Sequence, residues 1–141
     1  MNRFLAVVLP VVLAGCTAVS VKSVDPSVGL KHACIQENPK VEVDDFLDVV
    51  RGGFDRHGIS SEVFSGAKPT NCEYVLTYTA RKSWDVTTYL SYAELRLEKD
   101  GGRLASADYR LRGKGGFSLM KWQGTKAKMD PVIDKLLEGY N

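Results

Sequence analysis

Residues 72–111 alternate between apolar and polar side chains, and this pattern constrains the fold more than any other feature of the sequence. A period of two places successive side chains on opposite faces of a β-sheet, so the stretch predicts strands with one buried face. We expect strands over residues 74–81, 90–98 and 103–111, arranged as an antiparallel meander. Asp100-Gly101 supplies the positive φ that a tight turn between the last two strands requires.

An early helix is predicted over residues 44–57, because apolar side chains recur there three and four positions apart. Asp44 or Asp45 can cap its start, and Gly58 suits the left-handed residue that ends many helices. Gly52-Gly53 lowers the helix propensity, which indicates either a close approach to a neighbouring element or a weaker helix.

A second helix is predicted at the C-terminus. It starts either near Thr125, with a bend at Pro131, or at Asp130, with Pro131 in its first turn. Short strands are expected at residues 30–36 and 59–64. The order strand, helix, short strand, meander, helix predicts an α+β fold: a two-layer sandwich with both helices packed on one face of the sheet.

The N-terminus carries one basic residue, Arg3, followed by an apolar run over residues 4–13. This run is about half as long as the roughly 20 residues of a membrane-spanning helix, so residues 1–15 predict a cleaved signal peptide. Leu13-Ala14-Gly15-Cys16 matches the lipobox of bacterial lipoproteins, in which the cysteine thiol accepts a diacylglycerol. We therefore expect lipidation at Cys16; the alternative is an ordinary secretory signal in which this cysteine is incidental.

Thr17 follows the expected lipidation site, where inner-membrane lipoproteins commonly carry aspartate. This predicts sorting to the outer membrane. Residues 16–29 are expected to form a lipidated tether rich in serine, valine and small residues, either without regular structure or with a short extended piece, and residues 30–141 a single periplasmic domain. The membrane is thus an expected partner through the lipid.

Two cysteines, Cys34 and Cys72, remain once Cys16 is assigned to lipid. An exported chain meets an oxidising compartment, so a disulfide between them is predicted. Its loop of about 39 residues corresponds to roughly 4 kcal/mol of stabilisation in the chain-entropy model. The alternative is a pair of unrelated buried thiols.

Catalytic, metal and cofactor sites are not indicated. His32 and His57 lie on separate predicted elements, without the spacing of zinc ligands or of a catalytic histidine with its partners. Acids at Asp44, Asp45 and Asp48 are favoured by the dipole of a helix's first turn alone. Residues 113–116 are glycine-rich but lack the spacing of a phosphate-binding loop, which favours a flexible turn. We expect no enzyme, no metal and no cofactor.

Nineteen Lys and Arg side chains face seventeen Asp and Glu, which gives a net charge of +2 with both signs interspersed. No basic face is indicated, so nucleic acid is not an expected partner. Trp84, Tyr89 and Tyr92 flank a connection at one end of the sheet, where aromatic side chains can contact a partner or a glycan. The alternative is that these three residues cover the open end of the core.

Several motifs resemble an uncharacterised family of small proteobacterial outer-membrane lipoproteins. They are Ser83-Trp84-Asp85, Tyr89-Leu90-Ser91-Tyr92-Ala93-Glu94-Leu95, Gly113-Lys114-Gly115-Gly116-Phe117-Ser118-Leu119 and Lys121-Trp122. The resemblance extends over about residues 34–137 and implies a small α+β periplasmic module on a lipid anchor, without assigned catalytic residues. We expect an interaction module of the envelope with a protein or polymer partner. The alternative is a binder of a small ligand or glycan through Trp84, Tyr89 and Tyr92.

Overall fold

The structure is a computed structural model that describes residues 17–112 and 119–141. The expected lipidation site Cys16 and the glycine-rich residues 113–116 lie outside the described residues. Within the described part of the chain, no helix combines the length and the hydropathy needed to cross a membrane.

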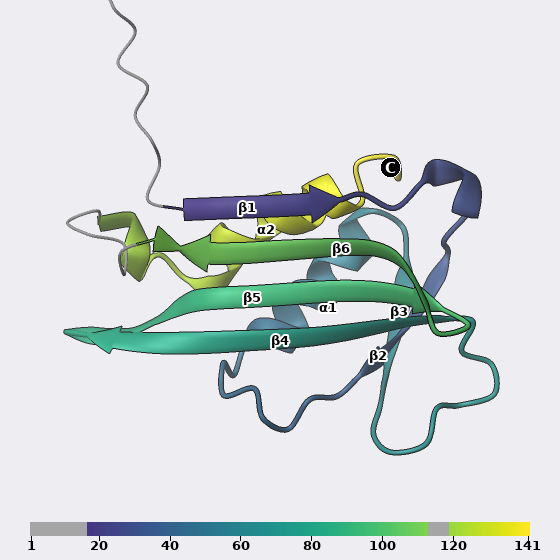
Figure 1. The fold of residues 1–141 in the computed structure, drawn as a ribbon, viewed down its shortest axis with the longest axis horizontal. Helices are drawn as coiled ribbons and strands as arrows, with labels where there is room; N and C mark the ends of the chain where they lie inside the picture. The colour runs from purple at the N-terminus through teal and green to yellow at the C-terminus, as the bar shows by residue number, and fades with distance from the viewer. Residues whose placement is uncertain (1–16, 113–118) are drawn as a thin grey trace, which may run out of the picture.

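Six strands form one sheet in the order β1-β6-β5-β4-β2-β3, and the two α-helices lie together behind it in Figure 1. The strands are β1 (Thr17–Lys22), β2 (His32–Gln36), β3 (Ser60–Phe64), β4 (Tyr74–Asp85), β5 (Thr87–Lys99) and β6 (Gly102–Leu111). The α-helices are α1 (Phe46–Arg56) and α2 (Thr125–Leu136), and short 3-10 helices occur at η1 (Pro26–Val28) and η3 (Leu119–Trp122). The fold is therefore α+β, with the early and C-terminal helices packed against each other.

The meander is present as predicted, with β4, β5 and β6 paired antiparallel in chain order. The side chains that the alternation directs inward are buried: Leu76, Tyr78 and Ala80 of β4, Ala93, Leu95 and Leu97 of β5, and Ala105, Ala107 and Tyr109 of β6. Asp100 (φ 50°) and Gly101 (φ 76°) form the predicted turn between β5 and β6. The helices cover the inward side chains, which leaves the other face of the meander open.

The sheet is mixed, which corrects the fold expected from the sequence, an antiparallel meander sheet. Strand β2 pairs in parallel with both β3 and β4. The chain leaves β2, passes through α1 and returns as β3, and a helical crossover of this kind is what joins neighbouring parallel strands. Short apolar segments carry no signal for strand direction, so the sequence pattern did not reveal this unit.

The expected tether over residues 16–29 is also corrected. Residues 17–22 form β1, which pairs antiparallel with β6 from Thr17 opposite Leu111 to Lys22 opposite Ser106. Val24 is buried, and its backbone N–H donates to the carbonyl oxygen of Leu136 at 2.8 Å. The unpaired edge of β6 offers backbone hydrogen-bonding groups, and a short alternating segment satisfies them. The domain therefore begins within one residue of Cys16.

Helix α2 begins at Thr125 and contains Pro131, which decides between the two starts that the sequence left open. Asp45 occupies the N-cap position of α1, but its carboxylate accepts a hydrogen bond from the Thr125 hydroxyl at 2.8 Å rather than from the helix backbone. Gly58 has the expected left-handed conformation, with φ 70°.

Cys34 and Cys72 form the predicted disulfide, with Cα atoms 5.7 Å apart. Cys34 lies on β2 and Cys72 lies just before β4, so the bond joins the parallel unit to the meander. Both residues are buried.

Candidate functional site

Trp84, Tyr89 and Tyr92 lie near one another in the chain but point into three different surroundings. A register shift between Arg81 and Lys82 interrupts the alternation in the β4–β5 pair. Tyr92 pairs with Arg81 just before this shift and stands on the open face. Beyond the shift Tyr89 is buried on the helix side, and Trp84 projects into solvent with 74% of its surface exposed. The structure therefore does not join the three into a single aromatic surface.

Tyr89 belongs to the core. Only 4% of its surface is exposed, and the ammonium groups of Lys128 and Lys121 lie 5.4 and 5.9 Å from the ring centroid. Lys128 donates to the carbonyl oxygens of Leu90, at 2.9 Å, and of Lys121. Burial lowers the pKa of Lys128 to about 8. With so little of its surface exposed, Tyr89 serves packing, as the alternative interpretation holds.

Tyr92 lies between two guanidinium groups on the open face. The Cζ atoms of Arg81 and Arg110 are 5.2 and 5.0 Å from its ring centroid, and its hydroxyl donates to Glu94 at 2.8 Å. Burial, and then the hydrogen bond to Glu94, raises the pKa of Tyr92 above its usual value. The three strands form a hollow of about 330 Å³ here, lined by Arg81, Lys82, Ser83, Ser91, Tyr92, Arg110 and Leu111. Such a surface suits an anionic group.

Trp84, Val86 and Trp122 form an apolar tip where β4 turns into β5. Val86 is 81% exposed and has φ 66°, a backbone conformation that is unfavourable for a β-branched residue. Helix η3 packs on this tip: the Trp122 indole N–H donates to the Asp85 carbonyl oxygen at 3.0 Å. The Lys121 ammonium lies 2.5 Å from the Asp85 carboxylate and neutralises it.

We define the hairpin end as the apolar tip and the basic hollow together: Trp84, Val86 and Trp122, with Arg81, Tyr92 and Arg110. The sequence indicated Trp84 and Tyr92 but missed the other four. Val86 and Trp122 are isolated apolar residues in the sequence, and Arg81 and Arg110 are 29 positions apart on strands whose pairing had to be known first.

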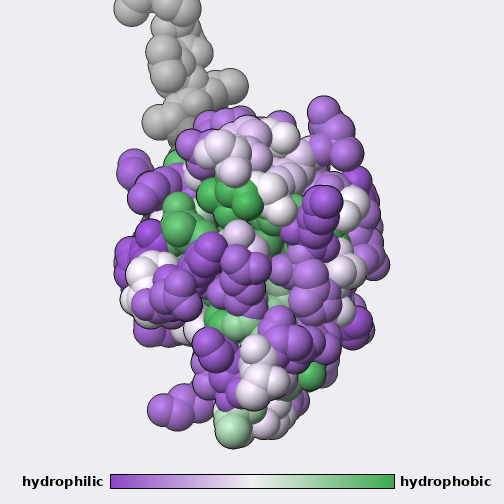
Figure 2. Space-filling model, turned by 90° about the vertical axis from the view of Figure 1, so that its right-hand side faces the viewer, coloured by the Kyte–Doolittle hydropathy of each residue, from purple (hydrophilic) through white to green (hydrophobic). Residues whose placement is uncertain are grey.

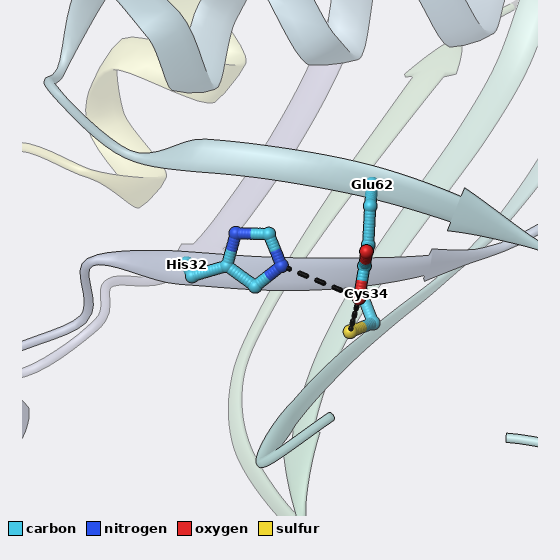
Figure 3. Close-up of side chains that lie close together, drawn as sticks. All are labelled: His32, Cys34 and Glu62. Atoms are coloured by element: carbon cyan, nitrogen blue, oxygen red, sulfur yellow. Dashed lines mark hydrogen bonds and ion pairs between the residues drawn. The ribbon is translucent and has the colours of Figure 1, made fainter. Parts of the chain in front are cut away.

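A second group of polar side chains lies on β2 and β3, where His32, Cys34 and Glu62 converge (Figure 3). One Glu62 carboxylate oxygen lies 3.1 Å from the Cys34 sulfur and 3.5 Å from His32 Nε2. The Cys34 sulfur is already bonded to Cys72 and is not available as a thiolate ligand. Two donors remain, which is fewer than a protein metal site requires.

Ser60 adds a hydroxyl to this second group, with its oxygen 2.7 Å from His32 Nδ1. A serine, a histidine and a glutamate thus adjoin, but Ser60 donates its own hydrogen to the Lys31 carbonyl oxygen at 3.2 Å. In the tautomer that carries hydrogen on Nδ1, the histidine donates to the serine oxygen instead of accepting its proton, which is the reverse of the arrangement that activates a nucleophile.

At the level of sequence, no family model and no curated protein matches the chain. Among solved structures, it is similar to the PelC dodecamer from Paraburkholderia phytofirmans, with a TM-score of 0.57 and 16% identity over 88% of this chain and 98% of that one. A variant of the same PelC gives a TM-score of 0.54 with 15% identity over 87% and 95% of the two chains.

A minor lipoprotein from Acinetobacter baumannii matches with a TM-score of 0.33 and 16% identity, over 75% of this chain and 86% of that one. The PelC comparisons show a shared fold over most of the chain. In structural terms the chain is an α+β module of the PelC fold. The resemblance to a lipoprotein family drawn from the sequence motifs stays a prediction.

Proposed function

We propose that this chain is a lipid-anchored, non-enzymatic interaction module of the bacterial envelope, held at the outer membrane through Cys16. In this proposal the hairpin end recognises another component of the envelope. The observation that carries it is the exposed tip: 74% of Trp84 and 81% of Val86 face solvent, although burial of such side chains is strongly favourable. Exposed apolar side chains rimmed by polar ones are typical of interaction sites.

The anchor is tested by growth with labelled palmitate. We expect label on the wild type and none on Cys16→Ser, which also retains its signal peptide. Separation of the two membranes by density gradient then tests the location. Label on the variant contradicts the anchor, and recovery with the inner membrane contradicts the sorting.

The recognition surface is tested by a photoreactive phenylalanine placed at position 84 or 86 in living cells. We expect adducts from these positions and few from Arg103, an exposed residue at the opposite end of the meander. A second copy of the chain is one possible adduct, because the PelC of similar fold is a dodecamer. Trp84→Ala should weaken capture from position 86 with little change in melting temperature; equal capture from position 103 contradicts the proposal.

The second candidate function is binding of a small anionic ligand or an acidic glycan. The observation that favours it is the basic hollow, where Arg81 and Arg110 flank Tyr92 on an open face. Guanidinium groups pair with carboxylate or phosphate in two parallel hydrogen bonds. Titration with acidic oligosaccharides tests it: binding that Arg110→Gln abolishes and Arg103→Gln retains favours this function.

A further inference from the structure

The course of the chain places the anchor beside the hairpin end. Strand β1 begins at Thr17, which pairs with Leu111 at the end of β6 where β4 and β5 also turn (Figure 1). Consecutive Cα atoms are about 3.8 Å apart, so an acyl chain on Cys16 is attached next to a residue held in the sheet. From Thr17 onward, the described residues provide no spacer that would let the domain stand away from a bilayer.

The exposed apolar side chains lie at this same end. Among the described residues, the large hydrophobic side chains that face solvent are Val19, Trp84, Val86 and Trp122. Three of them belong to the apolar tip, and Val19 is the third residue of β1. The opposite end of the meander, which faces the viewer in Figure 2, is covered mostly by hydrophilic side chains. The exposed apolar side chains thus gather at the end of the sheet where the proposed anchor is attached.

Val86 is an unfavourable choice for the turn itself. A positive φ is easily adopted by glycine or asparagine, whereas valine at φ 66° is strained. Backbone strain of this kind persists where the surroundings or the function require it. With 81% of its surface exposed, Val86 makes little packing contact that would compensate, so the tip gains from an apolar environment outside the domain.

Basic side chains border the tip on the open face. Arg81, Lys82 and Arg110 are exposed there, and the Asp85 carboxylate at the tip is neutralised by Lys121. The carboxylates of Glu42, Asp44 and Asp45 lie on the helix side, in a separate hollow that Lys82 also lines. A surface that combines an aromatic tip with guanidinium groups matches the interface of a bilayer, where indole rings and basic residues concentrate near phosphates.

We propose that the hairpin end is a membrane seat: Trp84 and Val86 enter the headgroup region of the bilayer, and Arg81 and Arg110 contact phosphates of anionic lipids. This inference rests on the lipid anchor of the proposed function and identifies the recognised component as the lipid surface. The sheet then meets the membrane with its hairpin end, and the polar end faces the periplasm.

The test uses the acylated mature protein with Trp122→Phe, which leaves Trp84 as the single tryptophan. The protein is bound to vesicles of phosphatidylethanolamine and phosphatidylglycerol whose acyl chains carry bromine, a short-range quencher of indole fluorescence. We expect most of the Trp84 fluorescence to be lost. The control carries Trp84→Phe, Trp122→Phe and Arg103→Trp, so that its tryptophan lies at the opposite end, and it should keep its fluorescence.

Two further variants separate the roles of the tip and of the arginines. Val86→Asn removes the strained valine, so the domain should be at least as stable while quenching of Trp84 decreases. Arg81→Gln with Arg110→Gln should reduce quenching on phosphatidylglycerol vesicles several-fold more than Arg103→Gln does. If quenching of Trp84 fluorescence is unchanged in all these variants, the proposal that Val86, Arg81 and Arg110 contact the bilayer is wrong.

If the fluorescence of Trp84 is not quenched on brominated vesicles, the proposed membrane seat is wrong. If position 84 forms protein adducts in cells at the same time, the proposed function stands with a protein as the recognised component. If Cys16 carries no acyl group, the anchor of the proposed function fails, which the palmitate experiment detects independently.

Discussion

Lys128 couples the stability of the domain to pH, since only 6% of this basic residue is exposed. Its pKa is about 8 in the folded state and near 10.5 when unfolded, because burial disfavours the charged form. The unfolded chain binds more protons between these values, so stability should rise as pH increases from about 8 to 10.5. Denaturant titrations of wild type and Lys128→Met should diverge over this window, by at most about 3 kcal/mol.

Tyr109 limits the rise in stability at higher pH. Burial raises its pKa to about 12, so deprotonation is easier in the unfolded chain and stability should fall as pH increases above 10. This decline should occur in wild type and in Lys128→Met alike, which separates it from the contribution of the lysine. Parallel curves for the two proteins from pH 8 to 10 would contradict the assignment to Lys128.

The Cys34–Cys72 disulfide acts on the unfolded state. The bond closes a sequence separation of 38 residues, and opening it restores chain entropy on unfolding. Reduction should therefore lower the free energy of unfolding by about 4 kcal/mol, as measured by urea denaturation. The double variant Cys34→Ala with Cys72→Ala serves as the control and should be insensitive to the reductant. A reduced protein as stable as the oxidised one would contradict this.

At the scale of elements, alternation and helical spacing predicted the strands and helices that depend on neighbouring residues in the sequence. They located β4, β5 and β6, the inward side chains of the meander, and both helices. They did not give the direction of β2 and β3, because a parallel pair is determined by the crossover between them rather than by side-chain pattern. They allowed at most a short extended piece where β1 lies and missed its pairing with the free edge of β6, more than 80 residues away in the sequence.

Gly53 resolves the alternative that the glycine pair left open. A Cβ at this position would lie 2.6 Å from Cγ2 of the buried Ile133, so α1 and α2 meet there in close contact. Gly53→Ala should lower the free energy of unfolding by about 1–3 kcal/mol through overpacking. At Gly52 a Cβ meets nothing within 4 Å.

Gly52→Ala is therefore the matched control and should stabilise the domain by about 0.5–1 kcal/mol through helix propensity. Thermal or urea denaturation of the two variants measures the difference. Ile133→Val should partly restore Gly53→Ala, because it removes a methyl group from the contact. If Gly53→Ala and Gly52→Ala are equally stable, α1 and α2 can move apart at no cost in free energy, and the predicted overpacking is wrong.

At the scale of the whole molecule, the candidate site was only partly accessible to sequence reasoning. The motif around Trp84 indicated one end of the sheet, but the basic hollow exists because strand pairing brings Arg81 and Arg110 to either side of Tyr92. The position of residue 17 beside the hairpin end likewise depends on β1 joining the sheet. With β1 as a loose tether, the proposed anchor at Cys16 and the apolar tip would have had no fixed position relative to each other.

If the protein carries the proposed lipid anchor, this fixed relation predicts how the domain is oriented on the membrane. On vesicles, a thiol introduced by Thr87→Cys at the hairpin should react slowly with a membrane-impermeant maleimide, because the bilayer covers it. Arg103→Cys at the other end should react as fast as it does in detergent.

A flexible Gly/Ser segment of about 20 residues inserted between Cys16 and Thr17 spans roughly 25 Å and should free the domain to rotate. Labelling of Thr87→Cys should then recover in part, with melting temperature unchanged. Equal labelling of both thiols on vesicles, with or without the inserted segment, would show that the domain has no preferred orientation at the membrane.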